Sequence, residues 1–100
     1  MKRFSKTWKA EWEGHVIVVT NWWDFRGRSG EALFIDEECV QKVEAQGHSA
    51  RDLHGEIKRR NRTYRVHVHI GSINLGTKVG CQIFVDNELI GGDIGKKFWT

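Results

Sequence analysis

One short segment of this chain occurs twice, and the repeat constrains the fold more than any other feature. Residues 30–40 read GEALFIDEECV and residues 80–90 read GCQIFVDNELI, at an offset of 50 in a chain of 100 residues. Aligned without a gap, residues 16–40 and 66–90 are identical at Val16/Val66, Val18/Val68, Gly30/Gly80, Phe34/Phe84, Asp36/Asp86 and Glu38/Glu88. The alignment predicts two similar halves, approximately residues 1–50 and 51–100.

Apolar and polar residues alternate with a period of two along most of the chain, which is the pattern of half-buried strands. In TWKAEWE, residues 7–13, the apolar residues alternate with lysine and glutamate, so the bulky side chains share one face. Similar segments follow, namely HVIVVTNW, EALFI, CVQKVEA, DLHGEIKRR, TYRVHVHI, CQIFV and LIGGDI. Turn residues separate them at Glu13-Gly14, Asp36-Glu37, Asn61-Arg62 and Asp86-Asn87. The spacing predicts about eight strands joined mainly as hairpins.

Two four-stranded units that each have one apolar face can bury those faces only against one another. We therefore predict an all-β fold, a two-sheet antiparallel β-sandwich built from two similar four-stranded halves, in a single domain spanning residues 1–100. A solenoid or propeller would need about three or more units. In the sandwich the repeated segment is the central hairpin of each sheet, and its aromatic residues, Phe34 and Phe84, are expected in the core.

The composition is that of a globular domain. Hydrophobic residues make up 39% of the chain and charged residues 29%, and the net charge is +3. No apolar run approaches the roughly 18 residues of a membrane-spanning helix, and FSKTWKAEWEG near the N-terminus is too polar for a signal peptide. We therefore expect a cytoplasmic protein with no membrane association. Cys39 and Cys81 lack CxxC spacing; the pattern permits a disulfide without requiring it, and we expect buried free thiols.

Several strand and turn motifs follow one another in a characteristic order: WEGHVIVVTN, a glycine, LFIDEECV, DLHGEI, YRVHVHI and CQIFVDNELIGG. In this order they resemble the motifs of domains of the Fas apoptotic inhibitory molecule family, over approximately residues 8–92. The family's strands end in Val-Asp-Gly turns, where this chain has Asp36-Glu37 and Asp86-Asn87. The resemblance implies an all-β sandwich that is a non-enzymatic interaction domain, and it supplies no catalytic residues.

The segment NWWDFRGRSG is a candidate binding loop. Trp22 and Trp23 are adjacent, so on a continuing strand they point to opposite faces and at least one lies near the surface. Together with Arg26 and Arg28, an exposed tryptophan would stack on a sugar ring or anchor a protein partner. The other interpretation is that the loop folds its aromatic residues back over the open edge of the sandwich.

A second candidate is the basic segment KRRNRTYR, which we place around a hairpin tip. Arg59, Arg60 and Arg62, with Tyr64 nearby, are the residue types that contact phosphates and stack on bases. However, the net charge of the chain is only +3, and successive strand residues alternate between faces. We therefore expect a solvent-exposed hairpin end, and nucleic-acid binding is not favoured.

The segment His67-Val68-His69 is the one candidate metal site. Residues two apart on a strand share a face, so both imidazoles would reach one ion, as in two-histidine zinc sites. In the ungapped alignment, however, these positions match Ile17 and Val19, and no spacing identifies a third ligand. We therefore predict no metal, with the pair as partly covered histidines at the sheet surface.

Enzymatic motifs are missing from the sequence: it has no Gly-x-Ser-x-Gly, and its GTKVG segment lacks the strand and helix of a phosphate-binding loop. The carboxylate pairs Asp36/Glu38 and Asp86/Glu88 suit turn formation. We therefore expect a non-enzymatic β-sandwich module for protein interaction or a structural role, with no cofactor. The alternative is a ligand-binding module that recognises carbohydrate or single-stranded nucleic acid through a Trp/Arg face.

Open sandwiches have edge strands, and the first strand is expected at an edge. Its polar face carries Lys9, Glu11 and Glu13. These alternating charges are self-complementary when two copies meet antiparallel, with Lys9 facing an acid of the other copy. We therefore expect a protein partner of unidentified kind and a weak homodimer through this strand.

Overall fold

Antiparallel strands account for nearly all of the chain that the computed structural model describes, which is residues 3–46, 51–73, 78–93 and 98–99. The strands are β1 (Arg3–Trp12), β2 (His15–Asp24), β3 (Arg28–Ile35), β4 (Glu38–Gln46), β5 (Arg51–Arg59), β6 (Arg62–Ile73), β7 (Lys78–Val85), β8 (Glu88–Gly92) and β9 (Phe98–Trp99). Within these ranges there is no helix that is long and apolar enough to cross a membrane. The all-β prediction is confirmed.

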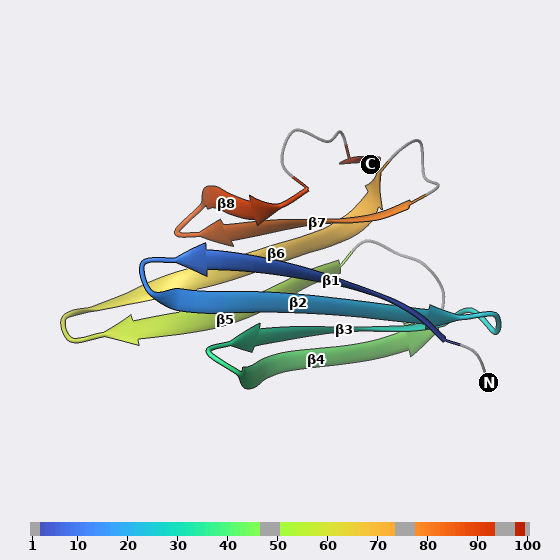
Figure 1. Cartoon of the computed structure of the whole chain (residues 1–100), viewed down its shortest axis with the longest axis horizontal. Coiled ribbons are helices and arrows are strands. Elements are labelled where there is room, and N and C mark those ends of the chain that lie inside the picture. Colours follow the sequence, from blue (N-terminus) through green and yellow to red (C-terminus); the bar gives the residue numbers. More distant parts are fainter. Residues whose placement is uncertain (1–2, 47–50, 74–77, 94–97, 100) are drawn as a thin grey trace.

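The strands form two antiparallel sheets, one from each half of the chain. The first sheet has the order β1-β2-β3-β4; the second has the order β5-β6-β7-β8, and β9 also pairs with β6. Four hairpin turns, residues 13–14, 36–37, 60–61 and 86–87, lie at one end of the molecule, which we call the hairpin end (Figure 1). The β2–β3 loop and the start of β1 lie at the opposite end, the loop end (Figure 1). The predicted sandwich of two similar four-stranded halves is therefore confirmed.

The repeated hairpins β3–β4 and β7–β8 match in detail. Both turns have two residues with positive φ, Asp36 (50°) and Glu37 (70°) in the first and Asp86 (47°) and Asn87 (67°) in the second. This backbone is that of a type I′ turn, whose twist matches that of the flanking strands. In both hairpins the register shifts directly before the phenylalanine, so one extra residue bulges from the second strand.

The strands β2 and β6 do not match at the offset that the ungapped alignment predicts. Ile35 pairs with Ile17, whereas the equivalent Val85 pairs with Val66. Ile17 is therefore equivalent to Val66, at an offset of 49, because the second half has one more residue between the paired strands. The identities Val16/Val66 and Val18/Val68 do not join equivalent positions, and this part of the alignment is wrong.

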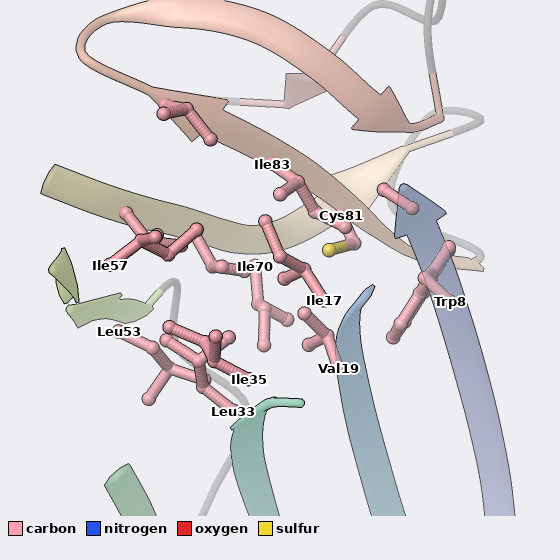
Figure 2. Close-up of a cluster of buried hydrophobic side chains, with 14 residues drawn as sticks. Trp8, Ile17, Val19, Leu33, Ile35, Leu53, Ile57, Ile70, Cys81 and Ile83 are labelled. Carbon is pink, nitrogen blue, oxygen red and sulfur yellow. The ribbon is translucent and has the colours of Figure 1, made fainter. Parts of the chain in front are cut away.

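The core lies between the two sheets and consists mainly of aliphatic side chains (Figure 2). Leu33 and Ile83 have no exposed surface and belong to it, together with their neighbours Ile35 and Val85. Phe34 and Phe84 are only partly buried, because neighbouring strand residues point to opposite faces and these two lie on the outer faces. The prediction that both phenylalanines are core residues is therefore wrong.

Two local predictions also differ from the structure. The β5–β6 turn is formed by residues 60–61, one position earlier than expected. Cys81 is a buried free thiol as predicted, and burial raises its pKa to about 12. Cys39 is also free but is exposed, because it lies opposite Phe34 on the outer face, next to the bulge.

Candidate functional site

An aromatic cluster made by Phe4, Trp23 and Phe25 lies at the loop end, and we call it the loop-end aromatic cluster. The rings of Phe4 and Trp23 are stacked with their centroids 5.8 Å apart, and Phe25 meets Phe4 edge-on at 5.3 Å. The β1–β2 register brings the first two together, because Phe4 is directly opposite Trp23. Phe25 is 78% exposed. The cluster therefore exposes the large apolar side chain of Phe25 to solvent, while the stacked rings of Phe4 and Trp23 pack beneath it.

The loop that carries Phe25 is ordered by the carboxylate of Asp24. Its Oδ1 accepts hydrogen bonds from the backbone N–H groups of Arg26 (2.9 Å) and Arg28 (3.1 Å), and its Oδ2 accepts one from Arg28 Nε at 2.9 Å. Gly27 has a φ of 78° and completes the turn. Burial acts to raise the pKa of Asp24, but the hydrogen bonds and the Arg28 charge outweigh it and lower the pKa. The Asp24 carboxylate therefore fixes the conformation of this loop.

Trp22 lies on the outer face of the first sheet, opposite Gly30. A Cβ at Gly30 would overlap the indole ring, so the ring packs directly over the glycine. The guanidinium of Arg3 lies 4.1 Å from the centroid of the same ring. A sugar or base that stacks on this side of Trp22 would have to displace Arg3.

The basic segment contains the β5–β6 turn and lies at the hairpin end, opposite the β2–β3 loop that follows Trp22 and Trp23 (Figure 1). Arg59 donates to Glu13 Oε1 (2.9 Å) and to the Glu13 carbonyl (2.7 Å), and its guanidinium is 5.0 Å from the Trp12 ring centroid. Arg62 bonds Asp86 Oδ2 at 2.7 Å, and its guanidinium lies 4.6 Å from the centroid of Tyr64.

Tyr64 is partly buried and packs against the core and Trp12, whereas Arg60 is exposed at the turn. Of the four predicted contact residues, Arg59 and Tyr64 thus join the ends of the two sheets, whereas Arg62 bonds Asp86 within the second sheet. The Trp/Arg residues predicted from the sequence form two separate groups at opposite ends of the molecule.

His67 and His69 lie on the outer face of the second sheet, and both contact Asp52. His67 Nε2 is 2.8 Å and His69 Nδ1 is 3.1 Å from Asp52 Oδ1. Partial burial acts to raise the pKa of Asp52, but the two histidines outweigh it and lower the pKa. His54 stacks on His67 at 4.9 Å between ring centroids.

The corrected register also changes the basis of the metal prediction. His67 and His69 are equivalent to Val18 and Thr20 on the outer face, and not to the core residues Ile17 and Val19. Within the described part of the chain, no group of three or more His, Cys, Asp or Glu side chains has an arrangement that would hold a metal ion.

A polar group inside the sandwich was not predicted. The Nδ2 of Asn21 donates to Glu31 Oε1 at 3.3 Å, and Arg51 Nη1 lies 3.3 Å from Glu31 Oε2. Burial raises the pKa of Glu31, an effect that Arg51 and Asn21 only partly offset. The equivalent pair in the second half is Ile70 and Cys81. The sequence could have predicted this group, because Asn21 and Glu31 stand at the alternate positions of β2 and β3 that face the core.

Comparison with protein families, with curated proteins and with solved structures found no match to this chain. The resemblance to the Fas apoptotic inhibitory molecule family therefore stays a prediction.

Proposed function

We propose that this chain is a non-enzymatic protein-interaction module and that its partner docks on the loop-end aromatic cluster. The exposure of Phe25, at 78%, is the observation that carries the proposal. Large aromatic side chains contribute much of the energy of protein interfaces when a partner buries them. Because Phe4 supports Phe25 and Asp24 orders the loop, little conformational entropy is lost on binding.

The partner is an acidic segment with at least one apolar anchor residue. Arg26 follows Phe25 directly, Arg28 lies two residues further along the loop, and Arg3 precedes Phe4 on the neighbouring strand. The acid of this loop, Asp24, is buried and bonded within the loop itself. The loop end therefore has an excess of positive charge around an apolar centre, which favours a partner of opposite charge.

Several carboxylates that would otherwise be candidates for catalysis have structural roles, which supports a non-enzymatic function. Asp36 accepts a hydrogen bond from the Val16 N–H at 2.9 Å, and Asp86 accepts one from the Arg65 N–H at 2.9 Å. Each carboxylate thus ties a β-turn to the neighbouring hairpin. The exposed free thiol of Cys39 fits a reducing compartment, so we place the protein in the cytoplasm.

The alternative is a module that binds carbohydrate or single-stranded nucleic acid through Trp22 and the nearby arginines. The contact between Arg3 and Trp22 favours it, because a guanidinium and an indole together suit a phosphate and a base. The two functions differ in their salt dependence. Binding to nucleic acid weakens steeply as salt is added, because counterions are released from the phosphates. At the protein interface salt screens only the arginine contacts, and the apolar contact of Phe25 persists.

Selection from a display library of random short peptides tests the proposal. We expect enriched sequences to combine Asp or Glu with an aromatic or aliphatic residue, and Phe25→Ser to weaken their binding by roughly tenfold or more. Val40→Thr is the matched control, because Val40 is another exposed large hydrophobic residue, on β4. Peptides that bind Phe25→Ser as tightly as the wild type would contradict the proposal.

The same variants distinguish the alternative. Ligand binding would be favoured over protein interaction by two results together. A single-stranded oligonucleotide or an oligosaccharide would bind the wild-type chain but not Trp22→Ala, and the binding of the enriched peptides would not depend on Phe25.

A further inference from the structure

Apart from the two-residue β9, the part of the chain that the structure describes has four edge strands, β1, β4, β5 and β8, and the last three are shortened, bulged or capped. β4 bulges at Val40, and β8 is only five residues long and bulges at Ile90. The β5 edge is capped by a side chain, because Gln41 Oε1 accepts a hydrogen bond from the His54 N–H at 2.6 Å. Short strands, bulges and covered edges are the usual means of preventing edge-to-edge association.

The edge formed by β1 lacks these features. It pairs with β2 over ten consecutive residues with no bulge, and no described strand pairs with its other side. The chain contains no proline that would interrupt it. One charged side chain does point inward from β1, which is a further means of edge protection: the Lys6 ammonium donates to the Val79 carbonyl of the second sheet at 3.0 Å.

The internal repeat shows why β1 differs from β5. Lys9 pairs with Val18, and His54 pairs with His67, so Lys9 in β1 is equivalent to His54 in β5. The residue equivalent to Gln41 is Gly91, because Gln41 pairs with Leu33 and Gly91 pairs with the equivalent Ile83. Glycine has no side chain, so the second half offers no equivalent of the Gln41 cap. The backbone groups of β1 that point away from β2 therefore lack that protection.

The outer side chains of β1 are complementary to a second copy of the same strand. Arg3, Ser5, Thr7, Lys9 and Glu11 are all exposed. When Thr7 lies opposite its own copy in an antiparallel pair, Arg3 faces Glu11 twice and Ser5 faces Lys9 twice. In this register the outer face of the sheet continues from one copy into the other. Residues 3–11 of one copy lie opposite residues 11–3 of the other, which is nearly the whole strand. A register centred on Ala10 pairs Lys9 with Glu11, but it opposes only residues 8–12 of the strand.

We propose that two copies of this chain associate through antiparallel β1–β1 pairing centred on Thr7, which joins their first sheets into one continuous sheet. The interface is small and polar, so the dimer forms at high protein concentration and dissociates on dilution. It uses the outer edge of β1, the strand that also carries Arg3 and Phe4 at the loop end, but it does not require the exposed Phe25 and does not rest on the proposed function. Its two-fold symmetry lets the N–H and C=O groups that point away from β2 in one copy pair with the same groups of the other copy.

Charge reversal at the paired positions tests the register. Glu11→Arg replaces two attractive Arg3–Glu11 contacts by repulsive ones, and we expect roughly tenfold weaker association in sedimentation equilibrium. Arg3→Glu has the same effect, and the double variant Arg3→Glu/Glu11→Arg restores the dimer. Glu44→Arg is the matched control, because Glu44 is an exposed acid on the opposite edge strand, β4. A chain that stays monomeric at high concentration, or a double variant that is as weak as the single variants, would overturn the proposal.

Cross-linking provides a second measurement that does not depend on charge. Opposed residues in a hydrogen-bonded antiparallel pair have Cα atoms about 5.5 Å apart, within the range of a disulfide. In a Cys39→Ser background, which removes the exposed native thiol, Thr7→Cys is expected to form disulfide dimers readily. Ser5→Cys alone is expected not to, whereas a mixture of Ser5→Cys and Lys9→Cys chains forms heterodimers. Equal cross-linking of Ser5→Cys and Thr7→Cys would contradict the register.

Discussion

Alanine substitutions at Leu33 and Phe34 test which side of the β3–β4 hairpin faces the core. Leu33 has no exposed surface and lies beside Ile35 and Leu53 in the core (Figure 2). Leu33→Ala leaves an enclosed cavity and is expected to lower the free energy of unfolding by roughly 3–5 kcal/mol. Phe34 is partly exposed on the outer face. Phe34→Ala loses only part of its apolar contact and leaves a gap open to solvent, so we expect roughly 1–2 kcal/mol.

Urea unfolding of the two variants, with m-values checked for constancy, measures this difference. The smaller side chain is expected to cost more, which reverses the order expected from residue size alone. The second half provides an independent repeat of the experiment, because Ile83 is fully buried and Phe84 is not. If both phenylalanine variants are as destabilised as their aliphatic neighbours, the assignment of inner and outer faces is refuted.

Three further predictions concern pH, packing and metal. The pKa of the Glu31 carboxyl is raised above its ordinary 4.5, so just above that pH the folded chain retains a proton that the unfolded chain loses. The wild type is therefore expected to lose stability relative to Glu31→Gln as the pH rises from 4.5 through the raised pKa, as measured by chemical denaturation. A stability difference that stays constant with pH would contradict this expectation. A Cβ at Gly55 would lie 2.9 Å from Val40 Cγ2. Gly55→Ala is therefore expected to lower the free energy of unfolding by roughly 1–3 kcal/mol in thermal or urea unfolding, and adding Val40→Ala should restore part of this loss. A Gly55→Ala variant as stable as the wild type would argue against this packing. Zinc titration followed by elemental analysis should give no stoichiometric complex, whereas an equimolar zinc that is lost in His67→Ala would overturn that expectation.

Alternation of apolar and polar residues was sufficient to predict the strands and the two-sheet sandwich, because a period of two specifies one buried face. It failed where three apolar residues are consecutive. In Leu33-Phe34-Ile35 the alternation allows either Phe34 or its two neighbours to point into the core. The packing of the hairpin on the opposite sheet decides between them, and the local sequence holds no information on that packing. The ungapped repeat was misleading over β2 and β6 for a similar reason, since one additional residue in a connection shifts the equivalence of a whole strand.

The candidate site was predictable only in part. Adjacent tryptophans on a strand point to opposite faces, and the contacts of Trp22 with Arg3 and of Trp23 with Phe4 agree with this. The stacking of Phe4 on Trp23 depends on the β1–β2 register, and the exposure of Phe25 depends on the turn that Asp24 orders. The contact of Arg59 with Glu13 joins residues from different sheets, so the sequence could not distinguish a structural arginine from one available to a ligand.

The most direct test of the proposed function is an NMR titration of the chain with an enriched acidic peptide, observing the indole N–H resonances of the tryptophans. Trp23 belongs to the loop-end aromatic cluster, whereas Trp12 packs against Tyr64 at the hairpin end. We predict that the Trp23 resonance shifts most and that the Trp12 resonance does not move. A Trp12 shift larger than that of Trp23 would contradict the assignment of the loop end as the interaction site.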